Sequence, residues 1–256
     1  MHIPKKRFGQ NFLDDQNIID KIIRSINPKL GQTLVEIGPG LGAITRPLLS
    51  LTDSLNVIEI DHGLVDQLQL IDDPNLKIFD ADALSFDFSQ FYRESDNCKF
   101  RVIGNLPYNI STPLLFYLFK YINQIEDMHF MLQKELVDRI CAAPHNKTYG
   151  RLSVIIQSSC NVEKLFNVPA TSFTPPPKVE SAIIRIIPKV NVELRPNSLD
   201  LVVRTAFSKR RKTLRNNLKD IMSSEDLEQS PVDLKLRAEN ISVAEFINLA
   251  KWYDTL

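Results

Sequence analysis

The hydrophobic and polar positions of this 256-residue chain follow two alternating patterns. Short apolar runs rich in β-branched residues, each ended by glycine or a polar residue, are typical of buried strands. Between these runs apolar residues recur every three or four positions, as the isoleucines of residues 18–26 do after Asp14 and Asp15. Such spacing predicts helices that cover a sheet. Strands that alternate with helices predict an α/β fold.

The strand pattern stops near residue 188. The predicted strands are 33–37, 56–61, 76–79, 100–103, 129–133, 162–168 and 182–187. Residues 191–196 look like a linker, and the chain beyond them has helical spacing without strand signals. We therefore expect two domains, residues 1–188 and residues 189–256, the second of them helical.

The predicted strand at 100–103 breaks at Gly104 and leads into Asn105-Leu106-Pro107-Tyr108. Ligands bind at the carboxyl ends of strands in open α/β sheets. An amide oxygen and a main-chain carbonyl beside proline can both accept hydrogen bonds from one amino group, and a tyrosine can stack on a nucleobase. The motif therefore suits an adenine amino group. It also fits an ordinary strand-to-helix turn, in which Asn105 caps the backbone and Tyr108 is half-buried.

A glycine loop follows the first predicted strand, with the order strand, loop and helix start in residues 33–45. Its G-x-G-x-G spacing departs by one residue from the dinucleotide fingerprint. S-adenosylmethionine (SAM) carries no phosphate and needs a close backbone approach, which Gly38 and Gly40 permit. Glu59 comes about 20 residues later, where an acid accepts ribose hydroxyls. The alternative for Glu59 is an exposed acid at the end of a strand.

Two aspartates follow the third predicted strand, in Asp80-Ala81-Asp82. No third carboxylate or histidine clusters with them in the sequence, so we expect no metal site. Asp82 is instead predicted to accept a hydrogen bond from the adenine amino group of SAM.

Composition predicts an ordinary globular protein of the cytoplasm. The chain is 43% hydrophobic and 24% charged, and 31 basic residues balance 31 acidic ones. Its three cysteines form no Cys-x-x-Cys pair, which argues against a disulfide framework or a zinc site. The basic amino terminus lacks the apolar core of a signal peptide, and no apolar run approaches the length of a membrane span.

The neutral average conceals two basic stretches. One is Lys5-Lys6-Arg7, and the other contains Arg204, Lys209, Arg210, Arg211, Lys212, Arg215 and Lys219 with no acid before Asp220. On a single helix Arg211, Arg215 and Lys219 would fall on one face. A basic face that only meets solvent has the same pattern, but the missing acids favour contact with phosphates.

The segment Phe173-Thr174-Pro175-Pro176-Pro177 is stiff, because three consecutive prolines cannot lie inside a sheet. It predicts a rigid loop that holds Phe173. This ring fits either a structural corner of the core or a stacking position near the cleft.

Taken together and in their order along the chain, these motifs resemble those of the ribosomal RNA adenine N6-dimethyltransferase family, and the resemblance covers essentially the whole chain. The matching pieces are residues 9–13, residues 36–42, Glu59, Asp82-Ala83, residues 105–108 and residues 173–179. The proline segment and the basic tail are most similar to the bacterial small-subunit (16S) enzymes. Two alternatives stay open: a large-subunit methyltransferase of the erythromycin-resistance type, and a mainly non-catalytic ribosome-assembly checkpoint factor. DNA adenine methyltransferases also use a related motif, but Leu106 stands where they have proline.

The resemblance implies a Rossmann-like SAM-dependent methyltransferase sheet of seven strands, the last antiparallel, with a small all-helical C-terminal domain. It implies dimethylation of N6 on two adjacent adenosines in a 16S rRNA hairpin near the 3′ end, during small-subunit biogenesis. Asn105 and Leu106 would hold the target amino group, with either the Leu106 or the Pro107 carbonyl as the second acceptor, and Tyr108 and Phe173 would sandwich the base.

The resemblance also assigns the remaining contacts. SAM would be bound by Gln10, Asn11, Leu13, Gly38, Gly40, Glu59, Ile60, Asp82, Ala83 and Asn105. With the charge pattern, it predicts RNA contacts at Lys5, Lys6, Arg7, Arg210, Arg211, Lys212 and Arg215. The expected partner is 16S rRNA in the immature small ribosomal subunit, and we expect a monomer that needs neither a metal nor a membrane.

Overall fold

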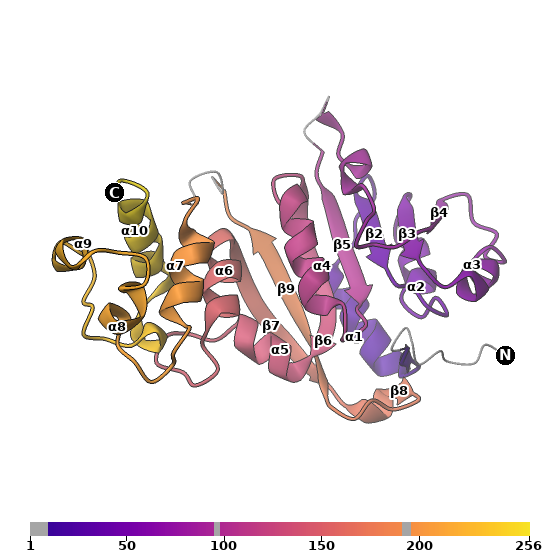
Figure 1. The fold of residues 1–256 in the computed structure, drawn as a ribbon. Helices are drawn as coiled ribbons and strands as arrows, with labels where there is room; N and C mark the ends of the chain where they lie inside the picture. The colour runs from indigo at the N-terminus through magenta and orange to yellow at the C-terminus, as the bar shows by residue number, and fades with distance from the viewer. Residues whose placement is uncertain (1–9, 95–97, 191–195) are drawn as a thin grey trace. The chain divides into compact units, whose positions relative to one another are not determined.

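The computed structural model describes residues 10–94, 98–190 and 196–256. Seven of its strands form one sheet in the order β4-β3-β2-β5-β6-β9-β7 (Figure 1). They are β2 (Thr33–Ile37), β3 (Leu55–Glu59), β4 (Leu76–Asp80), β5 (Phe100–Asn105), β6 (Ile125–Gln133), β7 (Cys160–Val168) and β9 (Ser181–Pro188). Strands β2 to β6 pair in parallel, and β9 runs antiparallel to β6. The predicted seven-stranded sheet with an antiparallel last strand is therefore confirmed.

The strand order reverses direction between β2 and β5, where an open α/β sheet forms its ligand crevice. Gly104 lets these two strands come close. A Cβ atom at this position would lie 2.7 Å from the carbonyl oxygen of Ile37 and 2.8 Å from the Leu106 side chain. The glycine before Asn105 is therefore required by packing at the crevice itself.

The first predicted helix is confirmed as α1 (Gln16–Ile26). Asp15 caps it by accepting hydrogen bonds from the amides of Asn17 and Ile18, and the isoleucine face is buried. The helices that follow the first strands are α2 (Thr45–Leu49), α3 (His62–Leu68) and α4 (Ser111–Leu118). Short 3-10 helices cover Phe88–Phe91, Phe119–Tyr121, Ala170–Ser172 and Ala238–Asn240.

A second, two-stranded sheet was not predicted. In it β1 (Phe12–Leu13) pairs antiparallel with β8 (Phe173–Thr174). Polar bonds extend this pairing: the amide of Asp14 donates to the carbonyl of Ser172 at 3.0 Å, and the hydroxyl of Thr174 donates to the Asp14 carboxylate. Phe173 is therefore in a strand and not in the rigid loop that the prolines predicted. Strands of two residues are too short to give a periodic signal.

The chain packs into two compact units, and they do not follow one another along the sequence. One contains residues up to Lys134 together with Glu163–Pro188, and the other contains Glu135–Val162 and Lys189–Leu256. Helix α5 (Lys134–Ile140) begins one residue before the second unit and otherwise belongs to it. The other helices of this unit are α6 (Arg151–Ser159), α7 (Leu199–Ala206), α8 (Leu214–Leu218), α9 (Ser224–Glu228) and α10 (Val243–Tyr253).

This structural division differs from the boundary at residue 188 because α6 packs with the C-terminal helices (Figure 1). Just before α6, the Tyr149 hydroxyl also donates to the Ile241 carbonyl at 2.9 Å, and its ring contacts Phe207. An RNA-contacting role for residues 189–256 stays a prediction.

Candidate active site

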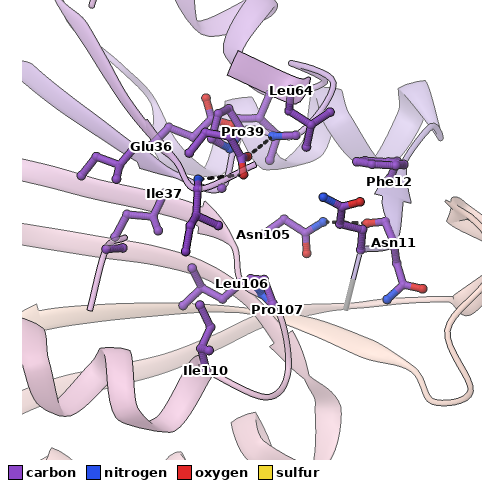
Figure 2. A pocket seen from close by; sticks show the side chains of 18 of the residues that line it. Asn11, Phe12, Glu36, Ile37, Pro39, Leu64, Asn105, Leu106, Pro107 and Ile110 are labelled. Carbon is purple, nitrogen blue, oxygen red and sulfur yellow. Dashed lines mark hydrogen bonds between the residues drawn. The ribbon is translucent and has the colours of Figure 1, made fainter. Parts of the chain in front are cut away.

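The predicted cofactor and target-base residues all line one cavity at the carboxyl ends of β2, β3 and β5. They are Gln10, Asn11, Leu13, Gly38, Gly40, Glu59, Ile60, Asp82, Ala83, Asn105, Leu106, Pro107, Tyr108 and Phe173. Figure 2 shows part of the cavity, with Asn11, Asn105, Leu106 and Pro107 among the labelled residues. Residues far apart in the sequence thus meet at the switch point of the sheet. Their individual roles stay predictions.

Glu59 ties the glycine loop to the end of β3. Its Oε1 accepts hydrogen bonds from the amides of Ile60 at 3.0 Å and Asp61 at 2.9 Å, and its Oε2 accepts one from Gly40 at 3.3 Å. Burial raises the pKa of this carboxyl, and the three amide bonds act in the opposite direction. A carboxylate has about four lone-pair sites, so Oε2 keeps one with which it is able to accept a hydrogen bond from a ribose hydroxyl.

The glycine loop and β1 lie against each other. Gly40 has a φ of +59°, and a Cβ atom there would lie 3.3 Å from the ring of Phe12. Only glycine meets both demands without strain. Phe12 lines the cavity and was not among the predicted site residues, although it stands inside the motif of residues 9–13.

The rest of this end of the cavity fits an adenosine group. Ile60 is 44% exposed although it is apolar, and it lines the cavity, as does the buried Ala83. Asp82 lines it too, and its Oδ1 accepts a hydrogen bond from the amide of Leu84 at 2.9 Å. This part of the cavity is therefore apolar, with carboxylates at Glu59 and Asp82. Such a combination suits a purine and its ribose, so the residues present fit SAM.

The N-terminal segment 10–13 fixes the orientation of the Asn105 side chain. The Nδ2 of Asn105 donates to the main-chain carbonyl of Asn11 at 3.3 Å, which leaves Oδ1 as the acceptor on the side of Leu106 and Pro107 (Figure 2). The same segment is held at Gln10, whose Nε2 donates to the Asp61 carboxylate at 2.9 Å. The amide is therefore oriented by tertiary contacts.

The two carbonyls after Asn105 are not equivalent. The carbonyl of Pro107 already accepts hydrogen bonds from the Ser111 hydroxyl at 3.0 Å and the Ile110 amide at 3.1 Å. That of Leu106 accepts none from the residues that the structure describes. The sequence left both as partners for a target amino group, and the structure favours Leu106.

The two aromatic residues differ in burial. Tyr108 is half-buried, whereas Phe173 is only 3% exposed and packs in the core with Leu13. Both line the cavity. Most of the Phe173 ring therefore lies in the core, as one of the two alternatives predicted. The role of Phe173 as a second wall for the base stays a prediction.

Glu36 also lines the cavity and was not among the predicted site residues. It is 2% exposed, and its Oε2 accepts a hydrogen bond from the Thr45 hydroxyl at 2.7 Å, which joins β2 to α2 below the glycine loop. Burial raises its pKa to about 7; the Thr45 bond acts against this and the charge of Glu59 adds to it. An alternating pattern cannot mark such a residue, because β2 is buried on both faces.

We expect Glu36 to make the free energy of unfolding depend on pH. Between its ordinary pKa of 4.5 and about 7, the folded protein keeps a proton that the unfolded chain releases. Its contribution is complete below pH 4.5 and is lost as pH rises through 7, by on the order of 2 to 3 kcal/mol. Burial lowers the pKa of His129 to about 4, which acts in the opposite direction over part of this range. Denaturant titrations at pH 5 and pH 8 should therefore show the loss as a difference in pH dependence between the parent and Glu36→Gln. Glu126→Gln, at an exposed position, is the control. Equal pH dependence in the parent and Glu36→Gln would contradict this prediction.

The basic C-terminal segment is not one helix, so the predicted face of Arg211, Arg215 and Lys219 is wrong. Helix α7 ends at Ala206, α8 begins at Leu214, and turns separate them. The buried side chain of Asn217 donates to the carbonyls of Ala206 at 2.5 Å and Lys209 at 3.3 Å. These carbonyls are thereby satisfied without a continuous helix.

Acids that are distant in the sequence reach part of this segment. Arg210 forms an ion pair with Glu239 at 3.0 Å and donates to the Lys147 carbonyl, and Arg215 lies 3.6 Å from Glu228. Lys209, Arg211 and Lys212 are exposed, and none of the described residues forms an ion pair with them. The exposed residue Lys147 lies on the same surface, because its carbonyl binds Arg210. The sequence did not predict this, since Lys147 stands 63 residues before Arg210.

Three further predictions concern the basic amino terminus, metal binding and the membrane. Lys5, Lys6 and Arg7 lie outside the described residues. Within the described ranges no group of three metal-binding side chains gathers. No helix in that part of the chain combines the length and hydrophobicity that crossing a membrane requires.

Comparison with known proteins places the chain in a family. Residues 1–255 match the family model for ribosomal RNA adenine dimethylase. A protein of Yersinia enterocolitica named ribosomal RNA small subunit methyltransferase A is 50% identical, over 98% of this chain and 94% of its own length. Its namesake in Aliivibrio fischeri is 47% identical over 99% of this chain and 94% of its own length.

Solved structures agree on the fold. A dimethyladenosine transferase from Plasmodium falciparum has a TM-score of 0.82 at 28% identity, covering 95% of this chain and 98% of its own. The 23S rRNA methyltransferase ErmE, at 22% identity, has a TM-score of 0.69 and covers 95% of this chain and 100% of its own, which supports the fold alone. The predicted Rossmann-like fold class is confirmed. From the family match and the identity along nearly its whole length, the chain belongs to the ribosomal RNA adenine dimethylase family.

Proposed function

We propose that this protein transfers methyl groups from SAM to N6 of two adjacent adenosines in a 16S rRNA hairpin near the 3′ end, during small-subunit biogenesis. The observation that carries this proposal is the orientation of Asn105, whose Nδ2 is engaged by Asn11 so that Oδ1 and the Leu106 carbonyl are both available as acceptors. Relatives of similar length at 47–50% identity bear the small-subunit name, which supports the 16S substrate over the 23S alternative.

The residues of the cavity then act by positioning and electrostatics. SAM supplies an electrophilic methyl group at its sulfonium. Asn105 Oδ1 and the Leu106 carbonyl would accept hydrogen bonds from the two N6–H groups, which favours a tetrahedral nitrogen whose lone pair points at the donor. The bond from N6 to the methyl group would form as the methyl–sulfur bond breaks, and the displaced N6 proton would pass to water. Tyr108 would stack on the base, which has to leave its helix to reach the cavity. No strong base is required, and none of the described histidines lines the cavity.

Transfer of label from tritiated SAM tests this function. Small subunits isolated without this modification are incubated with the protein, and the rRNA is digested to nucleosides. We expect label in N6,N6-dimethyladenosine, and none with subunits that already carry the modification. Label in 23S rRNA would support the erythromycin-resistance type, and the absence of transfer would support a checkpoint factor. With such substrates, the expected place of action is the cytoplasm, and the form that we propose is a monomer.

We also propose that the exposed basic loop after α7 binds the rRNA backbone. Arg211→Glu should weaken rRNA binding about tenfold at low salt and reduce the slope of log affinity against log salt by about 1. Arg210→Gln should change the slope less, because Glu239 already neutralises Arg210. Filter binding over a salt series measures both, with exposed Lys29→Glu as the control. Equal slopes for the parent and Arg211→Glu would contradict this contact.

A further inference from the structure

The hydroxyl of Tyr108 is held from outside its own motif. It shares a hydrogen bond with the Oγ of Ser181, at an oxygen–oxygen distance of 2.8 Å. Ser181 is fully buried in β9, 73 residues further along the chain. Tyr108 is half-buried and lines the cavity, and burial raises the pKa of its hydroxyl. The ring that would stack on the target base is therefore fixed at its far end.

Ser181 offers a rigid point of attachment. It pairs in register with Gln133 where β9 begins against β6. The preceding residue, Glu180, adds two bonds, because its carbonyl accepts from the Lys134 amide at 3.0 Å and its carboxylate from Lys134 Nζ at 2.9 Å. The backbone that carries the serine hydroxyl is thus held by pairing with β6 and by the bonds between Glu180 and Lys134.

The main chain before Tyr108 is equally constrained. The ring of Pro107 fixes its φ, and the Pro107 carbonyl accepts from Ser111 and Ile110 at the start of α4. A tyrosine fixed only at its backbone has several staggered side-chain conformations available. With its hydroxyl bound as well, Tyr108 keeps one ring orientation before any base arrives.

We propose that Ser181 is a positioning residue for methyl transfer, which keeps the Tyr108 ring as a preformed wall for the target adenine. The inference rests on the proposed function. A wall that is already ordered saves conformational entropy when the base binds. It also holds the amino group in line with Asn105 Oδ1, where small misalignments are costly in rate.

A double-mutant cycle tests this role with small subunits that lack the modification. Ser181→Ala and Tyr108→Phe should each lower kcat about fivefold, with KM for SAM unchanged, because each removes the same hydrogen bond. The double variant should be no slower than either single variant. Ser159→Ala removes another buried serine hydroxyl, 1% exposed and away from the cavity, and should leave kcat unchanged. Full activity of Ser181→Ala, or multiplied losses in the double variant, would overturn the proposal.

A second measurement does not depend on catalysis. In protein with 13C-labelled tyrosine rings, NMR relaxation should show greater mobility of the Tyr108 ring in Ser181→Ala, while the other tyrosines keep the mobility of the parent. Unchanged Tyr108 mobility would overturn the proposal even if the enzyme is active. If the parent protein transfers no methyl group, the proposed function fails, and the NMR result still decides whether Ser181 holds the ring.

Discussion

Asn105→Ala is expected to lower kcat by about 100-fold while changing the affinity for SAM only slightly. The lost acceptor would act mainly on the target nitrogen, and its hydrogen bond strengthens as that nitrogen becomes tetrahedral. Interactions that strengthen in the transition state affect kcat, and removing one such group typically costs 10²–10³ in rate. The orientation of Oδ1, fixed by the bond from Nδ2 to Asn11, is what makes the group preorganised.

Single-turnover methyl transfer to unmodified small subunits measures this loss, and calorimetry measures the affinity for SAM. The variant also leaves the Asn11 carbonyl without its donor, so a thermal unfolding curve is needed to show that the fold is kept. Asn123→Ala, at an exposed position, is the matched control. A turnover close to that of the parent would rule out the assigned role of Asn105.

Glu59→Ala should weaken SAM binding by about 100-fold and leave rRNA binding unchanged. Hydrogen bonds to charged groups contribute about 1.5–3 kcal/mol each, and the variant would lose the acceptor for the ribose. It would also release the amides of Gly40, Ile60 and Asp61 that now donate to the carboxylate. The glycine loop would then lose part of its order together with the ligand contact.

Calorimetric titration with SAM measures the effect, and filter binding of rRNA gives the comparison. Glu59→Gln should fall between the parent and Glu59→Ala, because it keeps one acceptor oxygen without the charge. Glu126→Ala, an exposed acid on β6, should bind SAM like the parent. If Glu59→Ala binds SAM as tightly as the parent, the ribose role is excluded.

The strands were predictable because each is a short buried run with a clear end. The first helix was predictable because its isoleucines repeat at helical spacing and Asp15 caps it. The pairing of β1 with β8 was not, since two-residue strands carry no pattern and their partners are more than 150 residues apart. Nothing in the spacing of residues 135–162 indicates that they pack with the C-terminal helices.

The basic segment shows where a local pattern is misleading. The spacing of Arg211, Arg215 and Lys219 favours one helix, but the amide of Asn217 takes carbonyls that a continuous helix would use. The window without acids suggested free positive charge, whereas Glu239 and Glu228 approach Arg210 and Arg215 through the fold. Charge compensation between distant segments leaves no trace in a sequence window.

By itself, the sequence determined the kind of sheet, the family and many of the cavity residues, though not Phe12 or Glu36, because strand composition and short motifs depend on neighbours along the chain. The tertiary structure alone decided which atoms of these residues are available. In it a hydrogen bond to Asn11 orients the Asn105 amide, and hydrogen bonds at the start of α4 occupy the Pro107 carbonyl. A third hydrogen bond holds the Tyr108 hydroxyl on Ser181. The physical reason is that hydrogen-bond partners are chosen by proximity in space, and the partners Asn11 and Ser181 lie 94 and 73 residues away.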